Sequence, residues 1–247
     1  MTTPYEQRTP RRAGRGIAVG VTALALCLTM SGTPGVAAPT GAPTSVNDTL
    51  RARGNPKAFN FLDRVNGEPV HWNPCAKPGW RINLHRAPKR AIPQAKEAMQ
   101  RIKNATGLHF RFQGRTHAAP RNFDKYPKDT DLVMGWGRPK ATGGAAGLGS
   151  AQYYTSGAAA GKIVNGFVVL NYKLNRKIAN GFGRGPRYGY QGTKGQLMMH
   201  ELAHAVGLRH VGDKAQIMYQ SLTRKKATWG AGDRNGLRKV GKAAGCF

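Results

Sequence analysis

The spacing of apolar residues along the chain predicts several strands. Period-two alternation of apolar and polar residues predicts strands at 80–84, 109–113 and 131–136. The nearly continuous apolar run at 163–172 is the strongest strand candidate. The glycine-rich stretch 143–149 leads into a short strand predicted at 151–155.

Apolar residues three and four positions apart predict three helices, over residues 93–106, 194–206 and 233–243. Thr193 is expected to cap the second of these helices, and Gly207 is expected to end it. Asp233 is expected to cap the third. Strands that alternate with helices in this order predict an α/β (α+β) fold, with a mixed sheet and helices packed against it.

The first 60 residues are predicted to lie outside this domain. Four arginines precede an apolar run at 17–30, and small residues follow at 35–38, as in a secretory signal peptide. Residues 1–38 are therefore assigned to the signal, and the Pro- and Thr-rich segment 39–60 to a flexible linker or short pro-segment. Residues 61–247 remain for the domain, which is expected outside the cell.

The chain is strongly basic, with 39 Lys and Arg against 11 Asp and Glu and a formal charge of +28. A field of this sign attracts anionic surfaces and polymers. No nucleic-acid-binding motif accompanies the charge, so an anionic cell envelope or an acidic substrate is the expected partner. The protein is expected to be a monomer.

One stretch of the second predicted helix carries the elements of a metal site. His200 and His204 are one helical turn apart, so both imidazoles point to one side and can hold Zn²⁺. Gly207 can adopt the left-handed conformation that lets the chain turn back and bring His210 in as the third ligand. Three protein ligands leave one position for water, and Glu201 is placed to act as its general base.

The two cysteines beyond the predicted signal, Cys75 and Cys246, have two interpretations. An even number of cysteines in an exported chain favours a disulfide between them. The alternative is that a free Cys75 thiolate ligates the metal and keeps the enzyme latent.

The pattern H-E-x-x-H-x-x-G-x-x-H from His200 to His210, followed by Met218 in Ile-Met-Tyr, resembles the matrixin branch of the metzincin clan. The resemblance is most specific over residues 197–220 and also includes secreted bacterial matrixin-like peptidases. It implies a twisted, mostly parallel sheet with an antiparallel edge strand, an active-site helix and a small loop-rich C-terminal subdomain closed by a helix.

The same resemblance implies roles for further residues. Met218 would form the floor beneath the three histidines, and Tyr219 and Gln220 would line the pocket for the residue after the scissile bond. Residues 163–170 would be the edge strand, so that a peptide substrate pairs with it. The residues of that strand singled out for substrate are Phe167, Val168 and Val169.

Two features separate this chain from relatives of the same clan. The acidic residues that bind structural calcium in animal matrixins are scarce here, since none lies between Asp131 and Glu201, so calcium is not expected. Asp213 follows His210 by three residues and is expected to support the ligands indirectly or to form a turn.

The predicted function is that of a secreted zinc-dependent endopeptidase, in which Glu201 activates a zinc-bound water to hydrolyse peptide bonds. One catalytic Zn²⁺ is the expected cofactor, and proteins or peptides are the expected substrates. Two alternatives remain at this point. One is a non-cleaving zinc module that binds anionic cell-wall polymer, and the other is an amidase acting on peptidoglycan stem peptides.

Overall fold

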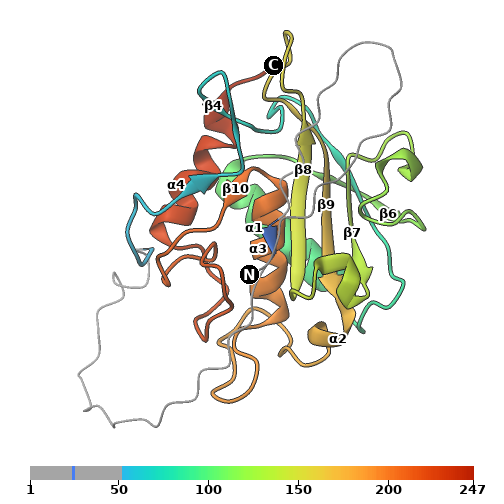
Figure 1. Cartoon of the computed structure of the whole chain (residues 1–247), viewed down its shortest axis with the longest axis vertical. Coiled ribbons are helices and arrows are strands. Elements are labelled where there is room, and N and C mark those ends of the chain that lie inside the picture. Colours follow the sequence, from blue (N-terminus) through green and yellow to red (C-terminus); the bar gives the residue numbers. More distant parts are fainter. Residues whose placement is uncertain (1–23, 26–51) are drawn as a thin grey trace.

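A six-stranded mixed sheet forms the centre of the computed structural model, which describes residues 24–25 and 52–247 (Figure 1). Its strands, in spatial order, are β1 (Leu24–Ala25), β8 (Gly147–Tyr153), β9 (Ile163–Asn171), β7 (Leu132–Gly137), β5 (Gly79–Ile82) and β6 (Arg111–Arg115). Strands β9, β7, β5 and β6 are parallel, whereas β8 runs antiparallel to β9 and β1 antiparallel to β8. The predicted α/β class with a mostly parallel sheet is confirmed.

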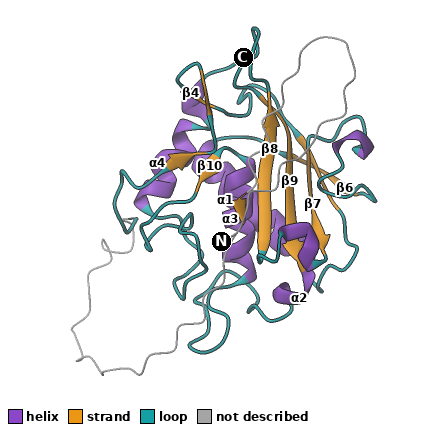
Figure 2. Ribbon diagram, in the orientation of Figure 1, coloured by secondary structure: helices purple, strands orange, loops and turns teal. Residues whose placement is uncertain are grey.

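Helices cover the sheet and close the chain (Figure 2). They are α1 (Ala91–Thr106), α2 (Tyr172–Asn175), α3 (Lys194–Ala205) and α4 (Ala231–Lys239), with 3-10 turns η2 (Phe123–Lys125), η3 (Pro139–Thr142) and η4 (Lys242–Ala244). Helix α3 packs on β8 and β9, α1 packs on α3, and α4 packs on α1. Two small antiparallel pairs complete the fold: β2 (Asn60–Phe61) with β10 (Leu208–Arg209), and β3 (Arg64–Val65) with β4 (Glu68–Pro69).

The two long predicted helices form for the local reasons that the sequence indicates. In α1 the buried face includes Ala95, Ala98, Met99 and Ile102, and Gly107 ends the helix with φ 75°. In α3 the Thr193 hydroxyl accepts a hydrogen bond from the Gln196 N–H at 3.2 Å and so caps the first turn. Every residue of α3 is buried, so tertiary packing as well as helix propensity stabilises it.

Two predictions of local structure were wrong. The strand predicted at 151–155 begins four residues earlier, at Gly147, because Gly147 and Gly149 lie against α3 and leave room for it, while residues 143–146 form a turn. Helix α4 begins at Ala231, so Asp233 lies within its first turn and is not the cap residue. The Asp233 carboxylate nevertheless accepts the N–H of the true cap residue, Gly230, at 2.9 Å.

The assignment of β9 as the substrate-binding edge strand was also wrong. Strand β9 lies between β8 and β7 and is hydrogen-bonded to both. Val168 packs in the main core, while Phe167 and Val169 belong to a second apolar cluster. The continuous apolar run is thus typical of a strand that is buried on both faces, and such strands are interior. The antiparallel strand is β8.

The predicted linker 39–60 is described only from residue 52, and this end of it contacts the domain. The Asn55 N–H donates to Asp213 at 2.9 Å, and the Arg53 carbonyl accepts the Ala231 N–H at 2.9 Å. The predicted signal peptide lies outside the described residues except for 24–25.

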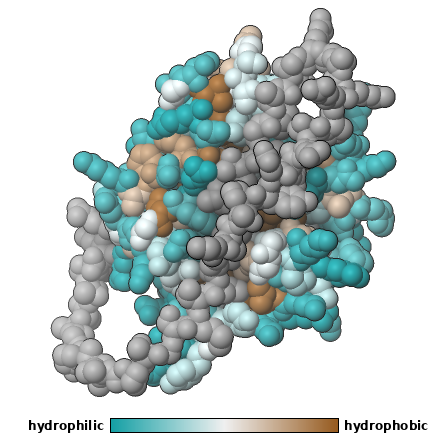
Figure 3. Space-filling model, viewed as in Figure 1, coloured by the Kyte–Doolittle hydropathy of each residue, from teal (hydrophilic) through white to brown (hydrophobic). Residues whose placement is uncertain are grey.

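The described part of the chain contains no helix that is long and apolar enough to cross a bilayer. The coloured residues in Figure 3 are mostly hydrophilic, with a few apolar patches among them.

Candidate metal centre and active site

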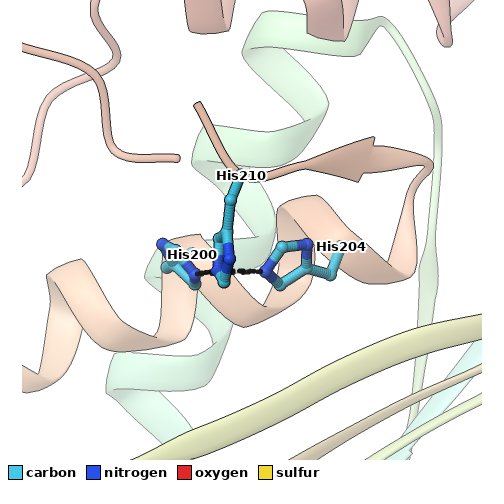
Figure 4. Close-up of side chains that lie close together, drawn as sticks. All are labelled: His200, His204 and His210. Atoms are coloured by element: carbon cyan, nitrogen blue, oxygen red, sulfur yellow. Dashed lines mark hydrogen bonds between the residues drawn. The ribbon is translucent and has the colours of Figure 1, made fainter. Parts of the chain in front are cut away.

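Three histidines converge at the C-terminal end of α3, as the sequence predicts. Their Nε2 atoms are 2.9 Å apart for His200 and His210, 3.1 Å for His200 and His204, and 3.2 Å for His204 and His210 (Figure 4). His200 and His204 lie one turn apart on α3, and His210 follows β10. Gly207, with φ 112°, turns the chain between them, and a Cβ at this position would lie 2.7 Å from the Val70 carbonyl oxygen.

Backbone carbonyl groups fix two of the three rings. His200 Nδ1 lies 2.7 Å from the Ile217 oxygen, and His204 Nδ1 lies 2.8 Å from the Leu208 oxygen. Because a carbonyl oxygen only accepts, each Nδ1 carries the hydrogen and each Nε2 presents a lone pair to the centre. Lone pairs that face one another in this way favour a cation between them.

Burial keeps these imidazoles neutral. It lowers the pKa of His200 to about 3, with the neighbouring His210 contributing, and it lowers the pKa of His204 well below its usual value. His210 is half-buried, and burial followed by the Arg209 charge lowers its pKa to about 4. Neutral imidazole is the form that ligates zinc.

The arrangement fits Zn²⁺. Tetrahedral zinc with bonds of about 2.0–2.1 Å to nitrogen requires ligand atoms about 3.3 Å apart, and the observed spacings come within a few tenths of an ångström of this. His200 and His204 are buried, and His210 is half-buried. The predicted metal ligands are brought together as expected.

Glu201 follows the first ligand and is fully buried. Neither carboxylate oxygen has a hydrogen-bond partner among the described residues. Burial raises the pKa of Glu201 well above its usual range, and the nearby Gly149 backbone offsets this in part. A buried carboxyl group without a partner is destabilising, and this one lies on the same helix as two of the three converging imidazoles.

Two glycines of β8 allow this strand to lie directly beside Glu201. A Cβ at Gly147 would stand 2.7 Å from Glu201 Cδ, and one at Gly149 would stand 2.7 Å from the Glu201 carbonyl carbon. Both glycines therefore face α3, two residues apart on one face of the strand. Sequence reasoning missed them, although the alternation of Gly147, Leu148 and Gly149 was a period-two signal.

The turn that contains Met218 contacts the metal ligand His200 through a backbone carbonyl group. Met218 is buried, and the carbonyl of the preceding Ile217 accepts the His200 Nδ1–H. The Asp233 carboxylate stabilises this turn, because it accepts the Ile217 N–H at 2.5 Å and the Met218 N–H at 3.2 Å. Asp233 was predicted only as a helix cap, and no local pattern could show that it reaches residues 217 and 218.

Asp213 is linked to the same turn indirectly, through Gln216 and Asp233. Its carboxylate accepts the Asn55 and Ala215 N–H groups and the Gln216 side-chain amide, at 2.8–2.9 Å. Gln216 Oε1 in turn accepts the Asp233 N–H at 2.9 Å. These hydrogen bonds connect Asp213 to Asp233, and through Ile217 to His200. The indirect support of the metal ligands by Asp213 stays a prediction.

The remaining predicted residues are placed as follows. Cys75 and Cys246 form a disulfide with Cα atoms 5.7 Å apart, so Cys75 is not free to ligate the metal. Tyr219 is half-buried beside Met218, and Gln220 is exposed. Their role as a pocket wall stays a prediction.

A comparison with known families agrees with this geometry. The profile of the family described as Matrixin matches residues 89–240, which is more than half of the chain and includes all three histidines and Glu201. No curated protein matches the chain.

Proposed function

The chain belongs to the matrixin family of zinc metalloendopeptidases, and we propose that it is exported and uses Glu201 as its general base. The observation that carries the catalytic proposal is the unpartnered Glu201 carboxyl group on the same helix as two of the three convergent imidazoles. His200, His204 and His210 would hold the metal. When bound, zinc polarises the scissile carbonyl group and makes water more acidic.

Glu201 moves the proton in both halves of the reaction. Its carboxylate takes a proton from the water that attacks the scissile carbonyl carbon. It then delivers this proton to the nitrogen of the departing amine, so no second acid is required.

Strand β8 is the proposed binding edge for an extended substrate. On the side facing away from β9, β8 pairs antiparallel with the short strand β1, with Leu24 opposite Gly149 and Ala25 opposite Leu148. A peptide that takes this place adds a strand to the sheet. Gly147 and Gly149 bring the same strand against Glu201, so a peptide on this edge lies close to the catalytic base. Tyr219 and Gln220 would line the pocket beyond the scissile bond.

Export is supported by the sequence before residue 39 and by the cysteines. The basic, apolar and small-residue segments are in the order of a signal peptide. The disulfide between Cys75 and Cys246 suits an oxidising compartment. We further propose that the mature protein acts as a monomer and that its positive charge holds it at an anionic cell envelope. Mass spectrometry of protein from the culture medium tests export: a chain that starts near residue 39 is expected.

Casein hydrolysis tests the catalytic proposal. The wild type should cleave casein, a chelator should stop the reaction, and added zinc should restore it. Glu201→Gln should bind zinc without cleaving, whereas Glu97→Gln, an exposed substitution in α1, should cleave normally.

The other outcomes identify the alternatives. A zinc-loaded protein that cleaves neither casein nor a peptide library, but binds purified cell wall, would be a non-cleaving module. A protein that solubilises peptidoglycan and leaves casein intact would be an amidase.

A further inference from the structure

A cavity of about 200 Å³ lies at the carboxyl edge of the parallel strands, and none of its lining residues belongs to the metal centre. It is lined by Arg86, Ala87, Pro88, Tyr172, Asn175 and Arg176. These residues come from the loop after β5 and from α2, which follows β9. Because β5 and β9 both run parallel to β7, their carboxyl ends meet at one edge, where open α/β sheets bind ligands.

Two guanidinium groups from these separate segments approach one aromatic ring. Arg86 Cζ lies 5.0 Å and Arg176 Cζ lies 5.3 Å from the centre of the Tyr172 ring. Arg86 is half-buried and has a left-handed backbone, with φ 64°, which is uncommon for a residue other than glycine. Its Nε donates to His85 Nε2 at 2.8 Å, so the guanidinium group is held in place. The fold thus brings two like charges together.

Nothing in the adjoining sequence compensates these charges. No acidic residue occurs between Glu68 and Glu97 or between Asp131 and Glu201, and these two stretches include every residue that lines the cavity. Further cations flank both segments, at Lys89, Arg90, Lys173 and Lys177. The local field therefore favours an anion.

A buried amide indicates where such an anion would bind. Asn175 is 1% exposed, and neither its Oδ1 nor its Nδ2 has a hydrogen-bond partner among the described residues. A buried polar group without a partner is destabilising unless a ligand or water completes it. An oxyanion in the cavity would give the Nδ2–H group an acceptor.

We propose that this cavity binds a phosphate group, with Arg86 and Arg176 on its oxygens and Asn175 Nδ2 donating to one of them. The planar guanidinium group matches the geometry of phosphate oxygens and binds them with charge-assisted hydrogen bonds. Free phosphate and the headgroup of an anionic phospholipid share this chemistry. The site is separate from peptide cleavage and does not depend on it.

Calorimetric titration of the zinc-loaded full chain with inorganic phosphate at low ionic strength tests the proposal. One saturable site is expected, and Arg86→Gln and Arg176→Gln should each weaken it about tenfold. Arg238→Gln removes the same charge from an exposed position of α4 and should leave the affinity unchanged. No saturable binding, or an equal loss in all three variants, would overturn the proposal. If Arg86→Gln fails to fold, the exposed Arg176 still provides the test.

Vesicles distinguish the two sources of phosphate. If the headgroup is the ligand, phosphatidylcholine vesicles that contain phosphatidylglycerol should bind the wild type. Added inorganic phosphate should then release the protein from these vesicles. Phosphatidylcholine vesicles alone are the control. Phosphate binding without vesicle binding identifies the free anion, and both results support the site.

Discussion

His200 and Asp233 contact opposite ends of one residue, Ile217. The Ile217 carbonyl accepts the His200 Nδ1–H at 2.7 Å, and the Ile217 N–H donates to Asp233 at 2.5 Å. A helix near the C-terminus thereby fixes the orientation of a metal ligand on another helix. Outer partners of this kind set the direction of ligand lone pairs and the basicity of the ring.

Replacing Asp233 should weaken both stability and metal binding. Asp233→Asn loses acceptor capacity for the three backbone N–H groups that the carboxylate satisfies, so we expect a loss of about 2–4 kcal/mol in the free energy of unfolding. Zinc affinity should fall about 10–100-fold. Urea unfolding and competition with a chromogenic chelator measure the two effects. Asp124→Asn, at an exposed position, is the control, and equal zinc affinity in both variants would refute the link to His200.

Gly149→Ala should displace α3 from the sheet. The new methyl group would stand 2.7 Å from the carbonyl carbon and 2.9 Å from the Cα of Glu201, and backbone atoms cannot move away independently. We expect destabilisation of about 3 kcal/mol, at the upper end of the usual cost of overpacking. Gly183→Ala meets no atom within 4 Å and should be nearly neutral in the same thermal melts.

Gly147→Ala should affect catalysis more than folding. Its new methyl group would meet the end of the Glu201 side chain, which can rotate, rather than backbone atoms. We expect kcat/KM for a peptide substrate to fall by about 10²-fold, as for a misplaced catalytic group, with a much smaller change in Tm than for Gly149→Ala. An unchanged kcat/KM would show that β8 does not set the position of Glu201.

Lys225 should give a pH-dependent contribution to stability. Its Nζ donates to the Ala215 carbonyl, and burial lowers its pKa to about 8, although Asp233 and Asp213 oppose the shift. Between pH 8 and the ordinary lysine value, the unfolded chain binds more protons than the folded one, so this residue adds stability as the pH rises through that window.

Comparing Lys225→Met with the wild type isolates this effect. From pH 8 to pH 10 the wild type should gain about 1 kcal/mol of unfolding free energy relative to the variant, allowing for the partial exposure of the side chain to solvent. Lys226→Met, at the exposed neighbouring position, should show no such pH-dependent difference. Urea titrations at each pH give the values.

Zinc should stabilise a fold that is already formed without it. Backbone carbonyl groups hold the rings of His200 and His204, and α3 is buried throughout, so the metal-free protein should melt cooperatively. At 1,000 times its Kd, zinc contributes about 4 kcal/mol, which corresponds to a rise of about 10 °C in Tm for a domain of this size. His204→Ala should abolish the rise, and His109→Ala, at an exposed position, should retain it. A metal-free protein without a melting transition would contradict this expectation.

The chemistry of the site was predictable because its information is local. A helical repeat places His200 and His204 on one side of α3, Thr193 starts the helix, and Gly207 allows the turn toward His210. These relations span about twenty residues and depend on backbone geometry that the sequence specifies directly. The strand at 163–172 was also predicted, since its composition suits a buried strand.

Sheet order, by contrast, was decided only by the tertiary structure. Strand β9 is interior and β8 is the antiparallel strand beside it because distant segments pair, and hydrophobicity alone does not tell which neighbour a strand takes. For the same reason the sequence did not show that Gly149 meets Glu201, that Asp233 reaches Ile217, or that Arg86 and Arg176 share the Tyr172 ring. Each of these contacts joins residues from separate elements, and only packing against the shared core brings them together.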